Sequence, residues 1–249
     1  MVLALQLAVA PVSPRAPALS AVLCLALAGA CSPSALPEAD PDAAPPAGEP
    51  DASAVDPAAA RSGCADGMRD GFLSIEASPD IAACAGGWSE PGLLTSIEPA
   101  CARAAGDDGD NPSGEGCNVA DLCAEGWHVC VGAAEVGARS GGSCAAATAD
   151  PAVPVFFATR QSGPGAAECG DGGENDLFGC GSLGAAVTQP SCAPLDRFSN
   201  DLCQALGAPW SCGADGTREA REVTKPSPEA GGVLCCRNGP LFTSTTESP

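Results

Sequence analysis

The stretch GGVLCCR (Gly231–Arg237) is short and apolar, and it contains two adjacent cysteines. Residues of this kind favour the extended backbone, so the stretch predicts a β-strand. Three other stretches predict strands on the same grounds, and they are GFLSI (Gly71–Ile75), WHVCV (Trp127–Val131) and VPVFFATR (Val153–Arg160).

Three segments predict helices. The segment 118–126 begins with Asn118 and the segment 199–207 begins with Ser199, and both residue types suit a helix N-cap. The third segment is 133–139. Short helices mixed with short strands and long connections predict an α+β fold that is rich in loops.

Cysteine is the most informative residue type in the folded region. The chain has 16 cysteines but only 6 Phe, 3 Trp and no Tyr, so its apolar core is poor in large side chains. An even number of cysteines after the N-terminal apolar region predicts a disulfide-rich domain, whose connectivity stays open. Zinc is disfavoured because no C-x-x-C pair occurs and His128 is the only histidine. The disulfide candidates are Cys64, Cys84, Cys101, Cys117, Cys123, Cys130, Cys144, Cys169, Cys180, Cys192, Cys203, Cys212, Cys235 and Cys236.

The charge of the chain limits its partners. Eleven Lys and Arg stand against 31 Asp and Glu, which gives a formal net charge of −20. No basic stripe is present to neutralise phosphates, so a nucleic-acid partner is not expected. The acidity favours solubility or attraction for cations and basic partners.

The N-terminal region predicts export. An uncharged apolar segment at 17–30 follows Arg15, as in a signal peptide. Its end, LAGAC (27–31), resembles the lipobox of bacterial lipoproteins, which implies cleavage before Cys31 and acylation of that cysteine. Ser32 resembles the outer-membrane sorting class of these lipoproteins. A plain secretory signal and an uncleaved membrane anchor are the alternatives.

The composition changes twice after the apolar segment. Residues 32–60 are rich in Pro, Ala and acidic residues, which predicts an extended tether without a core. The sequence therefore predicts a signal peptide at 1–30, an acylated Cys31 with its tether at 31–61, and a cysteine-rich globular domain at 62–249.

Two stretches resemble C-type-lectin-like domains. LCAEGWHVCVGAAEV (Leu122–Val136) is similar to the opening of these domains, and GGVLCCR is similar to their final strand. The resemblance implies a disulfide from Cys123 or Cys130 to Cys235 or Cys236, and an inner pair formed by Cys203 and Cys212. The chain lacks the Glu-Pro-Asn and Gln-Pro-Asp tripeptides with which sugar-binding members hold calcium.

Two acidic segments are candidate calcium sites, because calcium takes oxygen ligands. The same residues also suit solvated turns, and no other cofactor is expected. The first set is Asp107, Asp108, Asp110 and Glu115; the second is Asp171, Glu174 and Asp176.

Trp88, Trp127 and Trp210 are candidates for stacking on a sugar or a partner surface. Each also stands near a cysteine, and packing on a disulfide is the alternative role. His128 and Cys130 could form a thiol-enzyme pair, but a bridged Cys130 would exclude this.

The chain contains no G-x-S-x-G, HExxH or Walker motif, so no catalytic residue is assigned. The sequence predicts a non-enzymatic envelope protein that is held at the outer membrane by its lipid, facing the periplasm or the exterior, or is secreted. Its folded domain is expected to bind a carbohydrate or protein ligand. An exported hydrolase that uses carboxylates and a purely structural envelope component are the alternatives.

Overall fold

A computed structural model describes residues 57–94, 98–161, 174–183, 185–186, 190–199 and 202–241. The chain divides into two units, residues 1–50 and 51–249, and all described residues belong to the second. The predicted signal peptide, the predicted acylation site Cys31 and the predicted tether as far as residue 56 lie outside the described residues, and so do Cys169 and Asp171. No helix within the described ranges is long and apolar enough to cross a bilayer.

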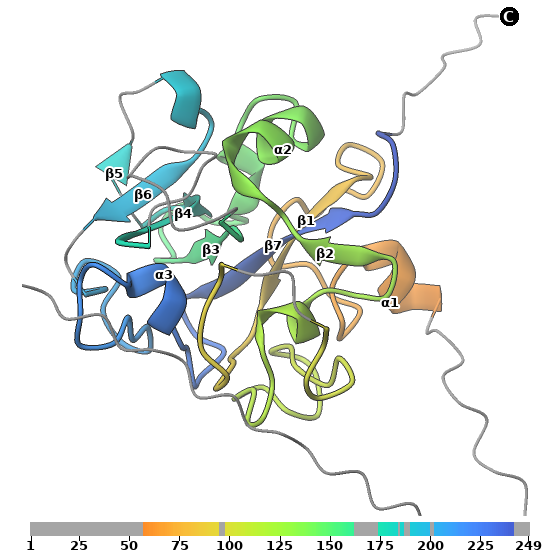
Figure 1. Cartoon of the computed structure of the whole chain (residues 1–249). Coiled ribbons are helices and arrows are strands. Elements are labelled where there is room, and N and C mark those ends of the chain that lie inside the picture. Colours follow the sequence, from red (N-terminus) through yellow and green to blue (C-terminus); the bar gives the residue numbers. More distant parts are fainter. Residues whose placement is uncertain are drawn as a thin grey trace, which may run out of the picture. The chain divides into compact units, whose positions relative to one another are not determined.

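One sheet organises the described domain (Figure 1). Its strand order is β1-β7-β3-β4-β6-β5, and β2 pairs with β7 outside this path. Strand β7 is antiparallel to β1 and β2 and parallel to β3, while β4 is antiparallel to β3 and β6. The strands are β1 (Ile81–Ala85), β2 (Trp127–Val129), β3 (Phe156–Ala158), β4 (Asp176–Gly181), β5 (Ala185–Ala186), β6 (Asp196–Ser199) and β7 (Gly231–Arg237).

Strand β7 has a buried cluster on each of its faces. Successive side chains of a strand point to opposite faces. Val233 and Cys235 belong to one cluster, whereas Leu234 and Cys236 belong to the other. Because β7 is covered on both faces, it forms the centre of an α+β domain.

Six disulfides are described, and the residues that they join are between 9 and 112 positions apart in the sequence. Each native bridge contributes about 2–4 kcal/mol to stability. The pairings of the final strand and of the inner loop are the ones that the lectin resemblance implies. Cys192 is also disulfide-bonded. The six bridges are Cys64–Cys84, Cys101–Cys117, Cys123–Cys235, Cys130–Cys236, Cys144–Cys180 and Cys203–Cys212.

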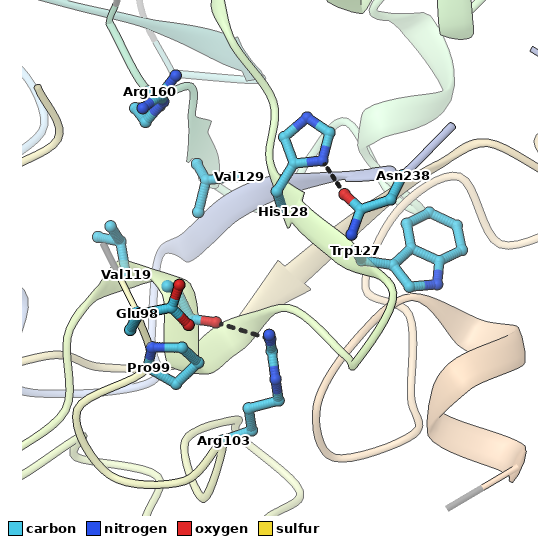
Figure 2. A pocket seen from close by; sticks show the side chains of 10 residues that line it. Glu98, Pro99, Arg103, Val119, Trp127, His128, Val129, Arg160 and Asn238 are labelled. Carbon is cyan, nitrogen blue, oxygen red and sulfur yellow. Dashed lines mark hydrogen bonds between the residues drawn. The ribbon is translucent and has the colours of Figure 1, made fainter. Parts of the chain in front are cut away.

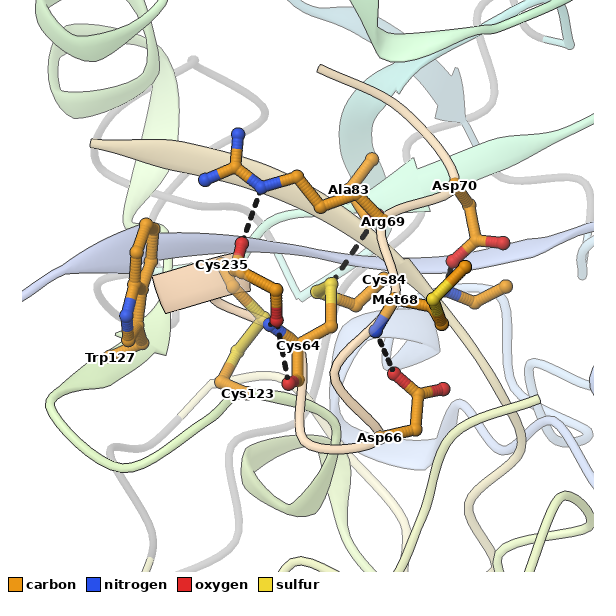
Figure 3. The surroundings of a disulfide bond; sticks show 12 residues. Cys64, Asp66, Met68, Arg69, Asp70, Ala83, Cys84, Cys123, Trp127 and Cys235 are labelled. Carbon is orange, nitrogen blue, oxygen red and sulfur yellow. Dashed lines mark hydrogen bonds between the residues drawn. A yellow bond between two sulfur atoms is a disulfide. The ribbon is translucent and has the colours of Figure 1, made fainter. Parts of the chain in front are cut away.

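The bridges Cys64–Cys84 and Cys123–Cys235 lie side by side (Figure 3). The backbones of Cys64 and Cys123 also pair with each other in an isolated antiparallel bridge. The segment that follows α1 is thus attached covalently to β1, and β1 pairs with β7.

The helices are short, and two of the three helix predictions are met in part. The predicted 118–126 helix is the 3₁₀-helix η1 (Val119–Leu122), and Asn118 caps it in a reciprocal capping box with Asp121. The predicted 133–139 helix is α2 (Gly132–Arg139). The remaining helices are α1 (Pro57–Ser62), α3 (Glu219–Glu222), η2 (Ala145–Ala147) and η3 (Pro190–Cys192).

Three boundaries differ from the sequence predictions. Residues 71–75 form no strand, because Phe72 has a φ of 53° and only Gly71 pairs with Ala83. The predicted 199–207 helix is wrong, since Ser199 ends β6 and Leu202 has a φ of 55°. Residues 57–61, which were predicted as the end of the tether, lie in helix α1.

Four strands, β1, β4, β5 and β6, are absent from the sequence predictions. Residues 81–85 are buried throughout, so their side chains show no alternation of apolar and polar types. Strand β4 contains glycine, which is rare in strands. A Cβ at Gly179 would lie 2.2 Å from the carbonyl oxygen of Phe157, so glycine permits the close approach of β3 and β4 there.

Candidate functional site

A pocket of about 410 Å³ opens between the loop 98–103, η1 and strand β2 (Figure 2). Half of its lining residues are polar or charged, and the apolar half consists of two valines, a proline, an alanine and a tryptophan. We call it the His128 pocket. It is lined by Glu98, Pro99, Arg103, Val119, Ala120, Trp127, His128, Val129, Arg160 and Asn238.

The wall of the pocket that carries His128 is fixed by backbone hydrogen bonds and by a disulfide. His128 lies on β2, which pairs with β7. The N–H of Arg160 donates to the carbonyl of Cys130 at 2.8 Å, and the N–H of Gly132 donates to the carbonyl of Arg160 at 3.1 Å. Cys130 is bridged to Cys236 of β7. These contacts place His128 and Arg160 on one rigid wall.

The opposite wall is organised by Asp121, which is fully buried. Its carboxylate accepts hydrogen bonds from the N–H groups of Ala100, Cys101 and Arg103 at 2.8, 3.0 and 2.9 Å. Among the described residues, the one group with metal-ligand spacing is Cys101, Cys117 and Asp121. This group is not available to a metal, since the cysteines form a disulfide and Asp121 holds the loop.

His128 has an acceptor at each ring nitrogen. Nδ1 lies 2.6 Å from Oδ1 of Asn238, and Nε2 lies 3.0 Å from Oε1 of Glu135. The hydrogen bond to Glu135 raises the pKa of His128, although burial opposes the rise. Two acceptors suit the imidazolium form, in which both nitrogens donate.

Glu135 holds His128 from helix α2. Burial alone would raise the pKa of Glu135, but hydrogen bonds from His128 and the N–H of Val131, together with Arg139, lower it to about 2. The Arg139 guanidinium lies 3.1 Å from the Glu135 carboxylate. The carboxylate is therefore ionised and committed to its partners.

Arg160 differs from Arg103, the other arginine of the pocket. Arg103 donates to the carbonyls of Ala120 and Cys123 and so supports the loop. The guanidinium of Arg160 is half-buried and has no hydrogen-bond or ion-pair partner in the described part of the chain. Its donors are therefore available to a ligand in the pocket.

The three tryptophans predicted as stacking candidates are buried, and Trp127 also lines the His128 pocket. Trp88, Trp127 and Trp210 are 0, 3 and 5% exposed. Trp88 packs edge-on against Trp210 at a centroid distance of 5.4 Å, and each indole N–H donates to a backbone carbonyl. In a chain with few aromatics, these rings fill the core.

The first predicted calcium set is not gathered into one site. Among the described residues, Asp107, Asp108, Asp110 and Glu115 form no group with metal-ligand spacing. Asn111 organises this loop instead: its amide donates to the carbonyl of Glu115 at 2.9 Å, and its Oδ1 accepts from the N–H of Glu115 at 3.1 Å.

The second predicted calcium set is only partly described. Asp171 lies outside the described residues. Glu174 forms an ion pair with Arg221, and Asp176 is fully buried on β4. The described members are thus placed in different environments, one at the surface and one inside the sheet.

A cluster of carboxyl groups was not predicted, and we call it the Asp70 cluster. Burial raises the pKa of Asp66 to about 6 and that of Asp70 to about 7, and the charge of Asp107 adds to both shifts. A Cβ at Gly106 would lie 2.3 Å from Oδ2 of Asp66, so glycine lets the Asp107 loop approach. Asp66 and Asp70 are seen beside the Cys64–Cys84 bridge in Figure 3.

A second cavity, of about 280 Å³, adjoins the Asp70 cluster. Its polar lining is acidic, and valines and a phenylalanine form its apolar side. Four carboxyl side chains line it: Asp70, Asp107, Asp150 and Glu229.

Lys225, the single lysine, is fully buried near the carboxyl groups of Glu229, Asp107 and Asp70. Its Nζ donates to the carbonyls of Gly86 at 2.9 Å and Ser227 at 2.6 Å. Burial lowers the pKa of Lys225 to about 7, although nearby carboxylates oppose this. No sequence signal brought the carboxyl groups and Lys225 together, because they come from four separate segments, at 66–70, 107, 150 and 225–229.

No family model matches the chain, and no solved structure matches it. The functional argument therefore rests on the residues themselves.

Proposed function

We propose that this chain is an exported, lipid-anchored envelope protein whose folded domain binds a carbohydrate in the His128 pocket without catalysis. The observation that carries the proposal is an open pocket with a wall held by backbone hydrogen bonds and with polar groups that include Arg160, whose side chain has no hydrogen-bond or ion-pair partner among the described residues. Ligand sites generally combine a preformed cavity with a few fixed polar groups.

Binding is favoured over thiol chemistry at this pocket. Cys130 forms a disulfide with Cys236, so it offers no thiol to His128. His128 is itself held by Glu135 and Asn238. A histidine that already donates to two acceptors suits ligand positioning better than proton abstraction.

A carbohydrate is favoured over a protein ligand. The exposed large apolar residues in the described part are Met68, Leu73, Val153 and Leu241, and none of them lines the pocket. Protein interfaces are usually centred on apolar and aromatic anchors. The charged and amide groups of the pocket suit sugar hydroxyls instead.

Export and the lectin-like architecture belong to the same proposal. Six disulfides support an oxidising compartment outside the cytoplasm. The bridges Cys123–Cys235, Cys130–Cys236 and Cys203–Cys212 support a C-type-lectin-like arrangement.

Acylation at Cys31 is tested by the intact mass of protein recovered from membranes. A chain that starts at residue 31 without acyl mass would overturn the proposed acylation.

The binding proposal is tested on a glycan array, followed by calorimetry with the glycans that bind. Glu98 is exposed at the pocket, and its replacement in Glu98→Ala should weaken binding about tenfold through lost hydrogen bonds to hydroxyls. Glu90→Ala is the matched control, because Glu90 is an exposed acid that does not line the pocket. Absence of glycan binding, or equal loss in both variants, would refute the proposal.

A hydrolase at the Asp70 cluster is the second candidate. The specific observation in its favour is the cavity lined by Asp70 and Asp107, in which a carboxyl with a raised pKa could act as general acid. The test is release of reducing sugar from the glycans of the array. Turnover that Asp70→Asn abolishes and Asp110→Asn spares would establish the hydrolase, since Asp110 is exposed and does not line the cavity, and absence of turnover would exclude it for those substrates.

A further inference from the structure

The His128 pocket has a distinctive arrangement of charge for so acidic a chain. The net charge is −20, yet two of the eleven Lys and Arg line this pocket together with the single histidine. Among the described residues that line the pocket, Glu98 is the only acidic one. The lining is therefore locally basic, against the sign of the whole protein.

Several other arginines of the described part have hydrogen-bond or ion-pair partners, unlike the half-buried Arg160. Arg69 donates to three backbone carbonyls, of Ser62, Phe72 and Ser78. Arg139 and Arg221 pair with the carboxylates of Glu135 and Glu174. A half-buried guanidinium without any such acceptor has five donors to satisfy, and a bound anion can satisfy them.

We infer that the ligand of the His128 pocket is a short acidic saccharide, whose carboxylate binds the guanidinium of Arg160 while its hydroxyls bind Glu98 and Asn238. This inference rests on the proposed carbohydrate-binding function and names the class of sugar. Figure 2 shows Arg160 and Glu98 at different sides of the pocket, with Val119 between them. A uronic acid saccharide that occupies the pocket would therefore place its acid group at Arg160 and its hydroxyl groups at Glu98.

The shape of guanidinium and carboxylate explains why a carboxylate is the expected anion. An arginine offers parallel N–H groups that match the two oxygens of a carboxylate. The backbone of Arg160 is held by Cys130 and Gly132, so the base of the side chain is fixed before the ligand arrives. A preorganised partner loses less conformational freedom on binding.

The net charge limits the length of the ligand. At physiological ionic strength the screening length is about 8 Å, so charges across the domain act weakly on a small ligand in the pocket. A long polyanion would reach the acidic surface around the pocket and be repelled. A short oligomer with one carboxylate at Arg160 avoids this repulsion.

The test compares trigalacturonic acid with its fully methyl-esterified form, which has the same sugar units without the negative charge. Calorimetry at 0.15 M salt should show the acid binding about tenfold or more tightly than the ester, which corresponds to roughly 1.4 kcal/mol. Arg160→Gln should abolish this preference. Arg218→Gln is the charge-matched control, since Arg218 is half-exposed and does not line the pocket.

The outcomes separate the inference from the function on which it rests. If acid and ester bind equally, or if Arg218→Gln reduces the preference as much as Arg160→Gln does, the acidic-sugar inference is wrong while carbohydrate binding stands. If the acid does not bind and no acidic glycan on the array binds, the inference is also overturned, and the presence or absence of neutral glycan binding decides the proposed function.

Discussion

The His128 pocket and the Asp70 cluster place carboxyl groups in opposite states within one domain. Glu135 has a pKa of about 2, because His128, Arg139 and a backbone N–H outweigh the effect of burial. Asp70 has a pKa of about 7, because burial and neighbouring carboxylates outweigh its hydrogen bond from the N–H of Ala85. The difference teaches that the partners, more than burial itself, decide the charge of a carboxyl group here.

The largest loss of stability is expected when the disulfide that holds the His128 side of the domain is removed. Cys130→Ala with Cys236→Ala removes a bridge with a sequence separation of 106 and should lower the free energy of unfolding by about 4–5 kcal/mol. The measurement is denaturant unfolding of the oxidised protein.

Removal of the bridge between Cys203 and Cys212, with a separation of 9, is the control and should cost about 2–3 kcal/mol. Equal losses from both bridges would contradict an account based on the entropy of the unfolded chain.

The Asp70 side of the comparison is tested by Asp70→Asn. A raised pKa favours the protonated form in the folded state, so its contribution is full below about pH 4 and is lost as the pH rises through about 7. The variant should be more stable than the natural chain at pH 8, by about 1–3 kcal/mol after allowance for screening, and about equal at pH 4. Thermal unfolding across this range measures how stability depends on pH. A variant that is less stable than the natural chain at pH 8 would show that the ionised Asp70 carboxylate stabilises the fold.

The Glu135 side is tested by Glu135→Gln. The interactions that raise the pKa of His128 stabilise the fold below about pH 6.5. This stabilisation is lost as the pH rises through the pKa that His128 has in the folded state. The interactions that lower the pKa of Glu135 stabilise the fold above about pH 4.5, and this stabilisation is lost as the pH falls toward 2.

The variant should therefore lose up to about 1 kcal/mol, and most of the loss should fall between about pH 4.5 and 6.5. Urea unfolding at pH 5.5 and 8 measures this, with Glu90→Gln as the exposed control. A loss that is equal at both pH values would exclude the His128 pair as its cause.

The smallest effect on stability is expected for replacement of Arg160. Since this guanidinium has no partner in the described part of the chain, Arg160→Gln should change the unfolding free energy by less than about 0.5 kcal/mol. Thermal unfolding without ligand provides the check. A larger loss would mean that the side chain supports the fold and is not free for a ligand.

The sequence predicted those elements whose pattern is local. The strands at 127–131, 153–160 and 231–237 contain β2, β3 and β7, and the helix at 133–139 lies within α2. Strand β1 was missed because all five of its residues are buried and small side chains dominate it.

The site could be predicted only in part, because side chains meet through the tertiary fold. Asp107 was predicted as a calcium ligand, yet its carboxyl faces Asp66 and Asp70. Arg160 carried no signal in the sequence, because it is a candidate only through the absence of a hydrogen-bond or ion-pair partner among the described residues. Such an absence is visible only when all the neighbouring groups are placed.

The Cys64–Cys84 bridge also has a mechanical consequence. Force applied to the residues ahead of Cys64 passes through the sulfur atoms directly to β1. From there it crosses the hydrogen bonds between β1 and β7 and reaches β2 through Cys236 and Cys130. A pull on the N-terminal side against a load held at His128 would thus be carried through two covalent bridges and one five-residue strand pairing, and strands β3 to β6 lie outside that path.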